Sequence, residues 1–121
     1  MATSVNYDMD QGATFSFTFV VKNDDGTPKN IKYDYSMYCQ MRKHYTSANS
    51  VTLTASKVDD GEFGEIKISL TASQTAEIKP GVYFYDVELI GLNTNTDLEE
   101  RGVIRRVQQG MITVYPEISK F

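Results

Sequence analysis

A chain of 121 residues, 40% of them hydrophobic and 23% charged, has the size and composition of one folded domain, and no linker-like stretch divides residues 1–121. Its net charge of −4 and isoelectric point near 4.9 argue against binding to nucleic acid or to an anionic membrane surface, because both need concentrated positive charge. No apolar run approaches the roughly 20 residues that span a bilayer, and the single cysteine, Cys39, excludes an intrachain disulfide.

The first part of the chain predicts two strands and a turn. A short strand is expected from Val5 to Met9. From Thr14 to Lys22, hydrophobic and polar residues alternate, which is the pattern of a strand with one buried face. That face comprises Phe15, Phe17, Phe19 and Val21. The segment Asn23–Pro28 contains Asp-Gly, which tolerates positive φ, and a proline that ends strand pairing, so it predicts a hairpin turn.

The middle of the chain predicts three more strands. Residues 35–43 alternate again, with Met37, Cys39 and Met41 on the buried side. The polar segment 44–50 is a connection. A strand at residues 51–55 and another at 66–70 flank an acidic, glycine-containing turn at residues 59–64, so they are expected to form a hairpin.

One helical turn interrupts the strands. Thr71 and Gln74 have the spacing of a capping box, and Pro80 disfavours helix at the residue before it, so the helix is a turn or two at most. Residues 82–90 then predict an interior strand. Its buried face comprises Tyr83, Tyr85, Val87 and Leu89, and Asp86 and Glu88 lie on the other face.

The last part of the chain predicts strand residues at 103–107 and 111–115. Gln108, Gln109 and Gly110 interrupt this run and indicate a bulge or a bend. With about seven to eight strands, few helical residues and regular turns, the pattern is typical of an all-β antiparallel sandwich.

The sequence shows no group of residues typical of a catalytic site. Nucleophilic catalysis needs a nucleophile, a base and a group that orients the base. The single histidine, His44, lies in a polar connection, and Cys39 shares its face with methionines, as a small buried hydrophobe does. One cysteine and one histidine cannot form a tetrahedral zinc site. We therefore expect no enzyme activity, no catalytic residue and no cofactor.

Acidic residues can also act as metal ligands or as catalytic groups. The turns around Gly26 and Gly61 contain oxygen ligands that calcium prefers, but neither matches the twelve-residue calcium loop, and acidic turns are common for backbone reasons. We expect no metal site. Asp86 and Glu88 share a strand face, which we expect to meet solvent or a partner subunit, and no sequence feature places a glycosidase cleft there.

Two groups of residues are candidates for contacts with other proteins. The first is the basic group Arg101, Arg105 and Arg106. It either discourages unwanted pairing of an edge strand or contacts an acidic neighbouring subunit. The second is a group of tyrosines that no core pattern requires. Exposed tyrosines serve as interface anchors and as sugar-stacking platforms. These residues are Tyr33, Tyr35, Tyr38 and Tyr45.

Four sequence blocks, taken in order, carry a resemblance to a known family. They are Asp10-Gln11-Gly12 with the three phenylalanines that follow, Gln40-Met41-Arg42-Lys43, residues 81–89, and Val114-Tyr115-Pro116-Glu117. Together they resemble the small immunoglobulin-like structural proteins of tailed-bacteriophage virions, and they are similar to the N-terminal domain of the phage baseplate upper protein family. The resemblance covers nearly all of the chain and implies an immunoglobulin-like sandwich. It does not set the strand pairing of residues 98–115, where the chain departs from the relatives.

The resemblance implies a non-enzymatic virion protein made in the host cytoplasm. It would act as a tail- or baseplate-associated adaptor, in multiple copies, through contacts with other virion proteins and without nucleic acid or membrane. Two alternatives stay open. One is a capsid decoration protein bound to the major capsid protein. The other is a carbohydrate-binding module, although the chain has no tryptophan, the residue that sugar stacking favours.

Overall fold

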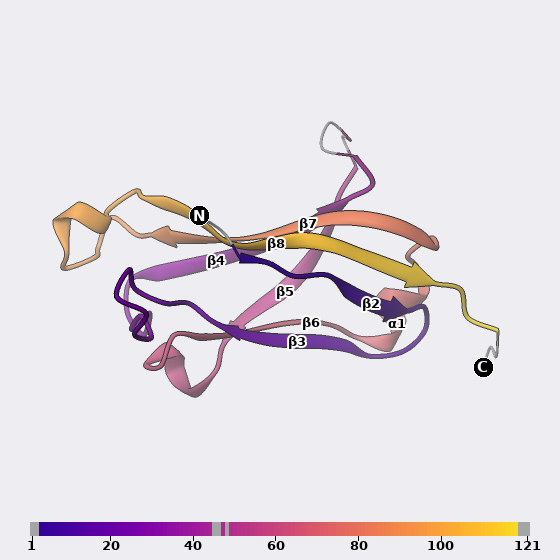
Figure 1. The fold of residues 1–121 in the computed structure, drawn as a ribbon, viewed down its shortest axis with the longest axis horizontal. Coiled ribbons are helices and arrows are strands. Elements are labelled where there is room, and N and C mark those ends of the chain that lie inside the picture. The colour runs from indigo at the N-terminus through magenta and orange to yellow at the C-terminus, as the bar shows by residue number, and fades with distance from the viewer. Residues whose placement is uncertain (1–2, 45–46, 48, 119–121) are drawn as a thin grey trace.

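The computed structural model describes residues 3–44, 47 and 49–118, and it confirms an all-β fold with one short α-helical turn (Figure 1). Two single 3₁₀ turns accompany that helix. The elements in chain order are β1 (Thr3–Ser4), β2 (Tyr7–Asp10), β3 (Phe15–Val20), β4 (Tyr35–Arg42), β5 (Val51–Lys57), η1 (Asp59–Gly61), β6 (Glu65–Leu70), α1 (Ala72–Ala76), β7 (Gly81–Gly91), η2 (Leu98–Glu100) and β8 (Ile104–Tyr115).

The strands form two layers that share one strand. The hydrogen-bonded order is β1-β8-β7-β4-β5-β6-β3, and β2 also pairs with β8. Residues 51–53 of β5 pair with β4, whereas residues 54–57 pair with β6, so β5 crosses from one layer to the other, as Figure 1 shows. In the immunoglobulin arrangement, strands C, F and G form one sheet and B, E and D belong to the other. Here β4, β7 and β8 correspond to the first set, and β3, β6 and the end of β5 to the second.

The N-terminal strands differ from the antiparallel expectation. One strand was predicted at Val5 to Met9. The structure instead has β1 and β2 on either side of Val5 and Asn6, and both strands pair in parallel with β8. Between them, the Val5 amide donates to the Gln109 carbonyl at 2.9 Å, so the two short strands follow one edge of β8. The sheet is therefore mixed rather than wholly antiparallel.

The turn at residues 23–28 forms, but it does not join two paired strands. The Asn23 amide donates to the Thr27 carbonyl at 2.7 Å, and Lys22 and Pro28 form an isolated antiparallel bridge. The strand before the turn, β3, pairs with β6, 45 or more residues further on, and not with β4. This pairing sets the aromatic face of β3 beside the isoleucines and leucine of β6, so burial and not turn chemistry selects the partner strand.

The remaining elements agree with the sequence patterns. The capping box is present, with the Thr71 hydroxyl accepting from the Gln74 amide at 3.2 Å and the Gln74 side chain accepting from the Thr71 amide at 2.8 Å. The hairpin of β5 and β6 is confirmed as well. The expected bulge in β8 lies at Val107, because Val87 is opposite Gln108 whereas Glu88 is opposite Arg106.

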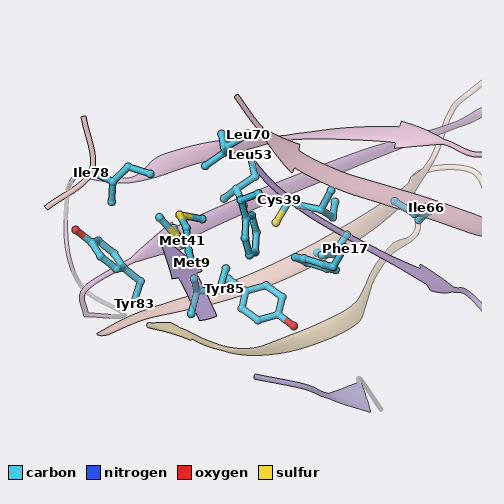
Figure 2. Close-up of a cluster of buried hydrophobic side chains, with 14 of the residues drawn as sticks. Met9, Phe17, Cys39, Met41, Leu53, Ile66, Leu70, Ile78, Tyr83 and Tyr85 are labelled. Atoms are coloured by element: carbon cyan, nitrogen blue, oxygen red, sulfur yellow. The ribbon is translucent and has the colours of Figure 1, made fainter. Parts of the chain in front are cut away.

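The core lies between the two layers, and Figure 2 shows its central side chains. Phe17 of β3 stacks on Tyr7 at 3.9 Å between ring centroids and meets Tyr85 of β7 edge-on at 5.8 Å, so aromatic contacts connect the layers. Cys39 is fully buried, and burial raises the pKa of its thiol to about 12. The sequence interpretation of Cys39 as a small core residue is confirmed.

A buried polar network fixes β8 against the N-terminal strands. The side chain of Gln108 is buried and donates to the hydroxyls of Tyr7 at 3.0 Å and Tyr85 at 3.1 Å. The Tyr85 hydroxyl in turn donates to the Val5 carbonyl at 2.8 Å. Two residues after Gln108, Gly110 has φ +156°, and a Cβ atom there would lie 2.0 Å from the Val5 carbonyl oxygen. Glycine is therefore required where the N-terminal segment passes β8.

We expect Gly110→Ala to lower the free energy of unfolding by about 2 kcal/mol, since the added methyl group must push the N-terminal segment away from β8. Gly26→Ala is the control, because it also has positive φ, +87°, but no atom lies within 4 Å of its Cβ position. Its expected cost is about 1 kcal/mol, from backbone strain alone. Urea denaturation of both variants measures the difference. An equal loss in both would contradict the close contact at Gly110.

Candidate interaction surface

The seven residues that the sequence suggested for contacts do not form one site. Tyr35 and Arg105 meet at a buried carboxylate, whereas Tyr38 and Arg106 lie on the outer side of the β4–β7–β8 layer. Tyr33 and Arg101 lie in loops, and Tyr45 lies outside the described residues.

The buried carboxylate belongs to Glu100, whose side chain is 8% exposed. One carboxylate oxygen accepts from Lys29 Nζ at 2.7 Å and from the Tyr35 hydroxyl at 3.0 Å. The other accepts from Arg105 at 2.6 Å. Because Lys29 and Arg105 stabilise the charged form, they lower the pKa of Glu100 from 4.5 to about 2, and the Tyr35 hydroxyl adds a smaller effect.

The local fold directs Glu100 inward. Asp97 caps η2 by accepting from the Glu99 amide at 3.1 Å, and Gly91 leaves room for the backbone of Glu100, whose carbonyl oxygen would lie 1.8 Å from a Cβ atom at Gly91. Arg105 is opposite Leu89 in the β7–β8 register and therefore lies on the core side of the sheet. The four side chains join the loop after β3, β4, η2 and β8 at one end of the sandwich.

The sequence analysis missed Glu100 and Lys29. The partners of Glu100 lie five residues away at Arg105 and 71 residues away at Lys29, and no sequence spacing connects them. An adjacent acid, Glu99, looks equivalent in the sequence but is exposed. The hydrogen bond of Tyr35 and the ion pair of Arg105 with Glu100 thus give both residues a partner within the chain itself.

The two loop residues have separate environments. Arg101 donates from Nε to the Asn95 carbonyl at 2.8 Å, which ties together the loop between β7 and β8. Tyr33 is 68% exposed, with Lys32 Nζ 5.3 Å from its ring centroid. The segment that contains Tyr33 contacts two other loops, because the Ile31 amide donates to the Gly61 carbonyl at 2.9 Å and the Leu92 amide donates to the Asp34 carbonyl at 2.8 Å.

The outward side of the β4–β7–β8 layer, called the outer face below, is built from three rows of residues that lie opposite one another across the strands. The first row is Tyr38, Glu88 and Arg106; the second is Gln40, Asp86 and Gln109; the third is Arg42, Phe84 and Met111. Beside these rows the outer face also contains Val82, Ile104, Thr113 and Tyr115. Arg106 and Asp86 form an ion pair at 3.3 Å between adjacent rows.

The outer face is more apolar than the solvent-facing side of a sheet normally is. Outward positions of an antiparallel sheet with one buried side are usually polar. Here five large hydrophobic side chains on the outer face are exposed, from Met111 at 38% to Ile104 at 61%. The other three are Tyr38, Val82 and Tyr115. Contiguous exposed apolar residues with polar neighbours mark interaction surfaces.

A shallow depression of about 550 Å³ lies in the outer face. Phe84 and Met111 supply its apolar lining, and the N-terminal segment borders it through Ser4 and Asn6. Its charged lining is balanced, with two arginines and two carboxylates. These are Arg42, Arg106, Asp86 and Glu88. The depression therefore suits a partner that brings both apolar and polar side chains.

A second, wider cleft of about 1110 Å³ separates the end of β3 from the start of β8. Lys22, Lys29, Arg105 and Arg106 contribute to its lining, together with Asp24. Glu100 and Asp86 already pair with three of these four cations. The cleft consequently has little unbalanced charge with which to hold an anion.

Within the described ranges, no three His, Cys, Asp or Glu residues are grouped so as to hold a metal ion. None of the helices in that part of the chain is long and apolar enough to cross a membrane. No protein-family model matches the chain, and a search of curated proteins finds no match to it.

We expect Glu100→Gln to lower the free energy of unfolding by about 3 kcal/mol at about pH 7, because it leaves Lys29 and Arg105 without their carboxylate. The folded-state pKa of Glu100 is depressed, so its stabilisation is present above about pH 4.5 and is lost as the pH falls toward about 2. The difference between the wild type and the variant should therefore shrink over that range.

Urea denaturation at several pH values measures this difference. Glu99→Gln is the matched control, since Glu99 is the exposed neighbour in the same 3₁₀ turn. Its effect should stay within about 0.5 kcal/mol at every pH. A deficit for Glu100→Gln that stays constant between about pH 7 and pH 2 would show that the charge of Glu100 is not the source of the stabilisation.

Proposed function

We propose that the protein is a non-enzymatic structural subunit of a tailed-bacteriophage virion, associated with the tail or baseplate and acting through protein–protein contacts. The outer face is the observation that carries this proposal, because exposed apolar side chains on a regular sheet surface suit contact with another protein. The sequence blocks that resemble immunoglobulin-like virion proteins give the class of assembly. Multiple copies on a symmetric particle would multiply weak contacts.

Two observations support a role without catalysis. The only cysteine is buried with a raised thiol pKa, which disfavours the thiolate that acts as a nucleophile. His44 is exposed at the end of β4, and its backbone amide is capped by the Ser47 hydroxyl at 3.1 Å. The extensively hydrogen-bonded sheet around them fits a scaffold that presents surfaces.

The second candidate keeps the virion and moves the protein to the head, where it would decorate the capsid. The outer face suits this role equally, because its exposed apolar side chains could contact a capsid protein as well as a tail protein. The alternatives differ only in the partner, so they are separated by identifying that partner.

Cross-linking mass spectrometry on purified virions identifies it. We expect the protein in the virion, with cross-links from exposed lysines to tail or baseplate subunits. Lys43 directly follows β4 in the β4–β7–β8 layer, and Lys67 lies on β6 in the opposite layer, so their links report which layer lies nearer the neighbour.

Cross-links to the major capsid protein would instead support the capsid decoration role. Absence of the protein from virions of the phage that encodes it would contradict both forms of the proposal.

A further inference from the structure

We infer that the partner of the outer face is a second copy of this chain, bound across a two-fold axis. The inference rests on the proposed function, because it takes the outer face as the interaction surface, and it names what covers that surface. A two-fold contact buries the same patch on both subunits, so the patch must be complementary to itself in charge and shape.

Charge distribution favours self-association at the outer face over the end of the sandwich that holds the long loops. The outer face contains Arg42 and Arg106 against Asp86 and Glu88, and so it is neutral within a chain of net charge −4. By contrast, the end of the sandwich formed by the connected loops 21–34, 58–64 and 92–103, called the loop end below, has more acidic than basic residues and exposes many carboxylates. These belong to Asp24, Asp25, Asp59, Asp60, Glu62, Asp97 and Glu99. Two loop ends would repel each other, whereas two outer faces meet without a net like-charge cost.

The register of the rows fixes one favourable arrangement. A two-fold axis that crosses the strands along the second row superposes the first row of one copy on the third row of the other. Tyr38 then faces Arg42 of the second copy, and Arg106 faces Met111. At the axis Asp86 lies opposite Asp86 of the second copy, and each carboxylate is paired with Arg106 of its own chain at 3.3 Å. An axis along β7 would add a second like-charge contact, because it places Glu88 opposite Glu88 as well as Asp86 opposite Asp86.

The depression gives Tyr38 a place to bind. Tyr38 is 57% exposed, and it does not line the depression of its own chain. Arg42 and Phe84 of the other copy line theirs, so the incoming ring would meet a guanidinium and an aromatic side chain. An aromatic side chain inserted into a pocket near the centre of an interface is a common energetic anchor.

Sedimentation velocity of the purified chain at concentrations from about 1 to 200 µM tests the inference. We expect a dimer of twice 13.7 kDa at the upper concentrations. Tyr38→Ala and Met111→Arg should each raise the dissociation constant about tenfold or more, the second because it sets a like charge opposite Arg106 of the other copy. Phe63→Glu, at an exposed position on the loop end, should leave it unchanged. Circular dichroism verifies that each variant is folded.

A short bismaleimide cross-linker tests the orientation. Gln40 lies on the proposed axis at the exposed surface of β4, so Gln40→Cys should cross-link to itself, and Phe63→Cys should not. The native Cys39 is buried and should not react. The inference fails if the wild type is a monomer throughout, if the dimer resists both outer-face substitutions, or if Gln40→Cys does not cross-link. Virion cross-linking is independent of these results, so a monomer in solution that is found on tails would reject the dimer alone.

Discussion

The extra residue in β8, Val107, determines which side chains the protein buries and which it presents. In a regular strand, alternate residues face the same side, so a single inserted residue exchanges the two sides. Before the bulge, Arg106 faces outward and Arg105 faces the core side; after it, Ile112 and Val114 are buried and Met111 faces outward. Without the inserted residue, the residues before and after position 107 could not both face the sides that they face here, and one of the two segments would turn its core-side residues outward.

Two polar clusters keep the strand in this register. Gln108, directly after the bulge, bonds the hydroxyls of Tyr7 and Tyr85 within the core. Ahead of the bulge, Arg105 pairs with Glu100 at the loop end. Among the described residues, no buried side-chain nitrogen or oxygen lacks a hydrogen-bond partner. A slip of β8 by one residue would separate Gln108 and Arg105 from their hydrogen-bond partners. The cost of leaving buried polar groups unpaired therefore adds to the loss of hydrophobic burial.

Local patterns in the sequence predicted local structure well, and pairings between distant segments poorly. The alternation of Phe15 and Phe17 gave a strand with the correct buried face, and the capping box at Thr71 formed as predicted. The pairing of β3 with β6 and the parallel N-terminal strands were not predicted, because periodicity defines faces but does not choose partners. The buried ion cluster was missed for the same reason, since Glu100 and Lys29 meet only in the folded chain. The bulge was expected close to its observed position, because the polar residues and the glycine that interrupt β8 are adjacent in sequence.

The loop end and the outer face differ in charge, and this difference limits how two copies of the chain could associate. Acidic side chains occupy the exposed turns at the loop end, where Asp59 and Asp60 also accept positive φ, so backbone geometry alone explains their presence there. Because the loop end carries this excess of acidic residues, it repels the loop end of a second copy. The outer face has balanced charge and does not repel the outer face of a second copy. The same turn chemistry that closes the sandwich thus restricts the surfaces through which copies of this chain can approach. Orientation in an assembly follows from the exclusion of one surface as much as from the attraction of another.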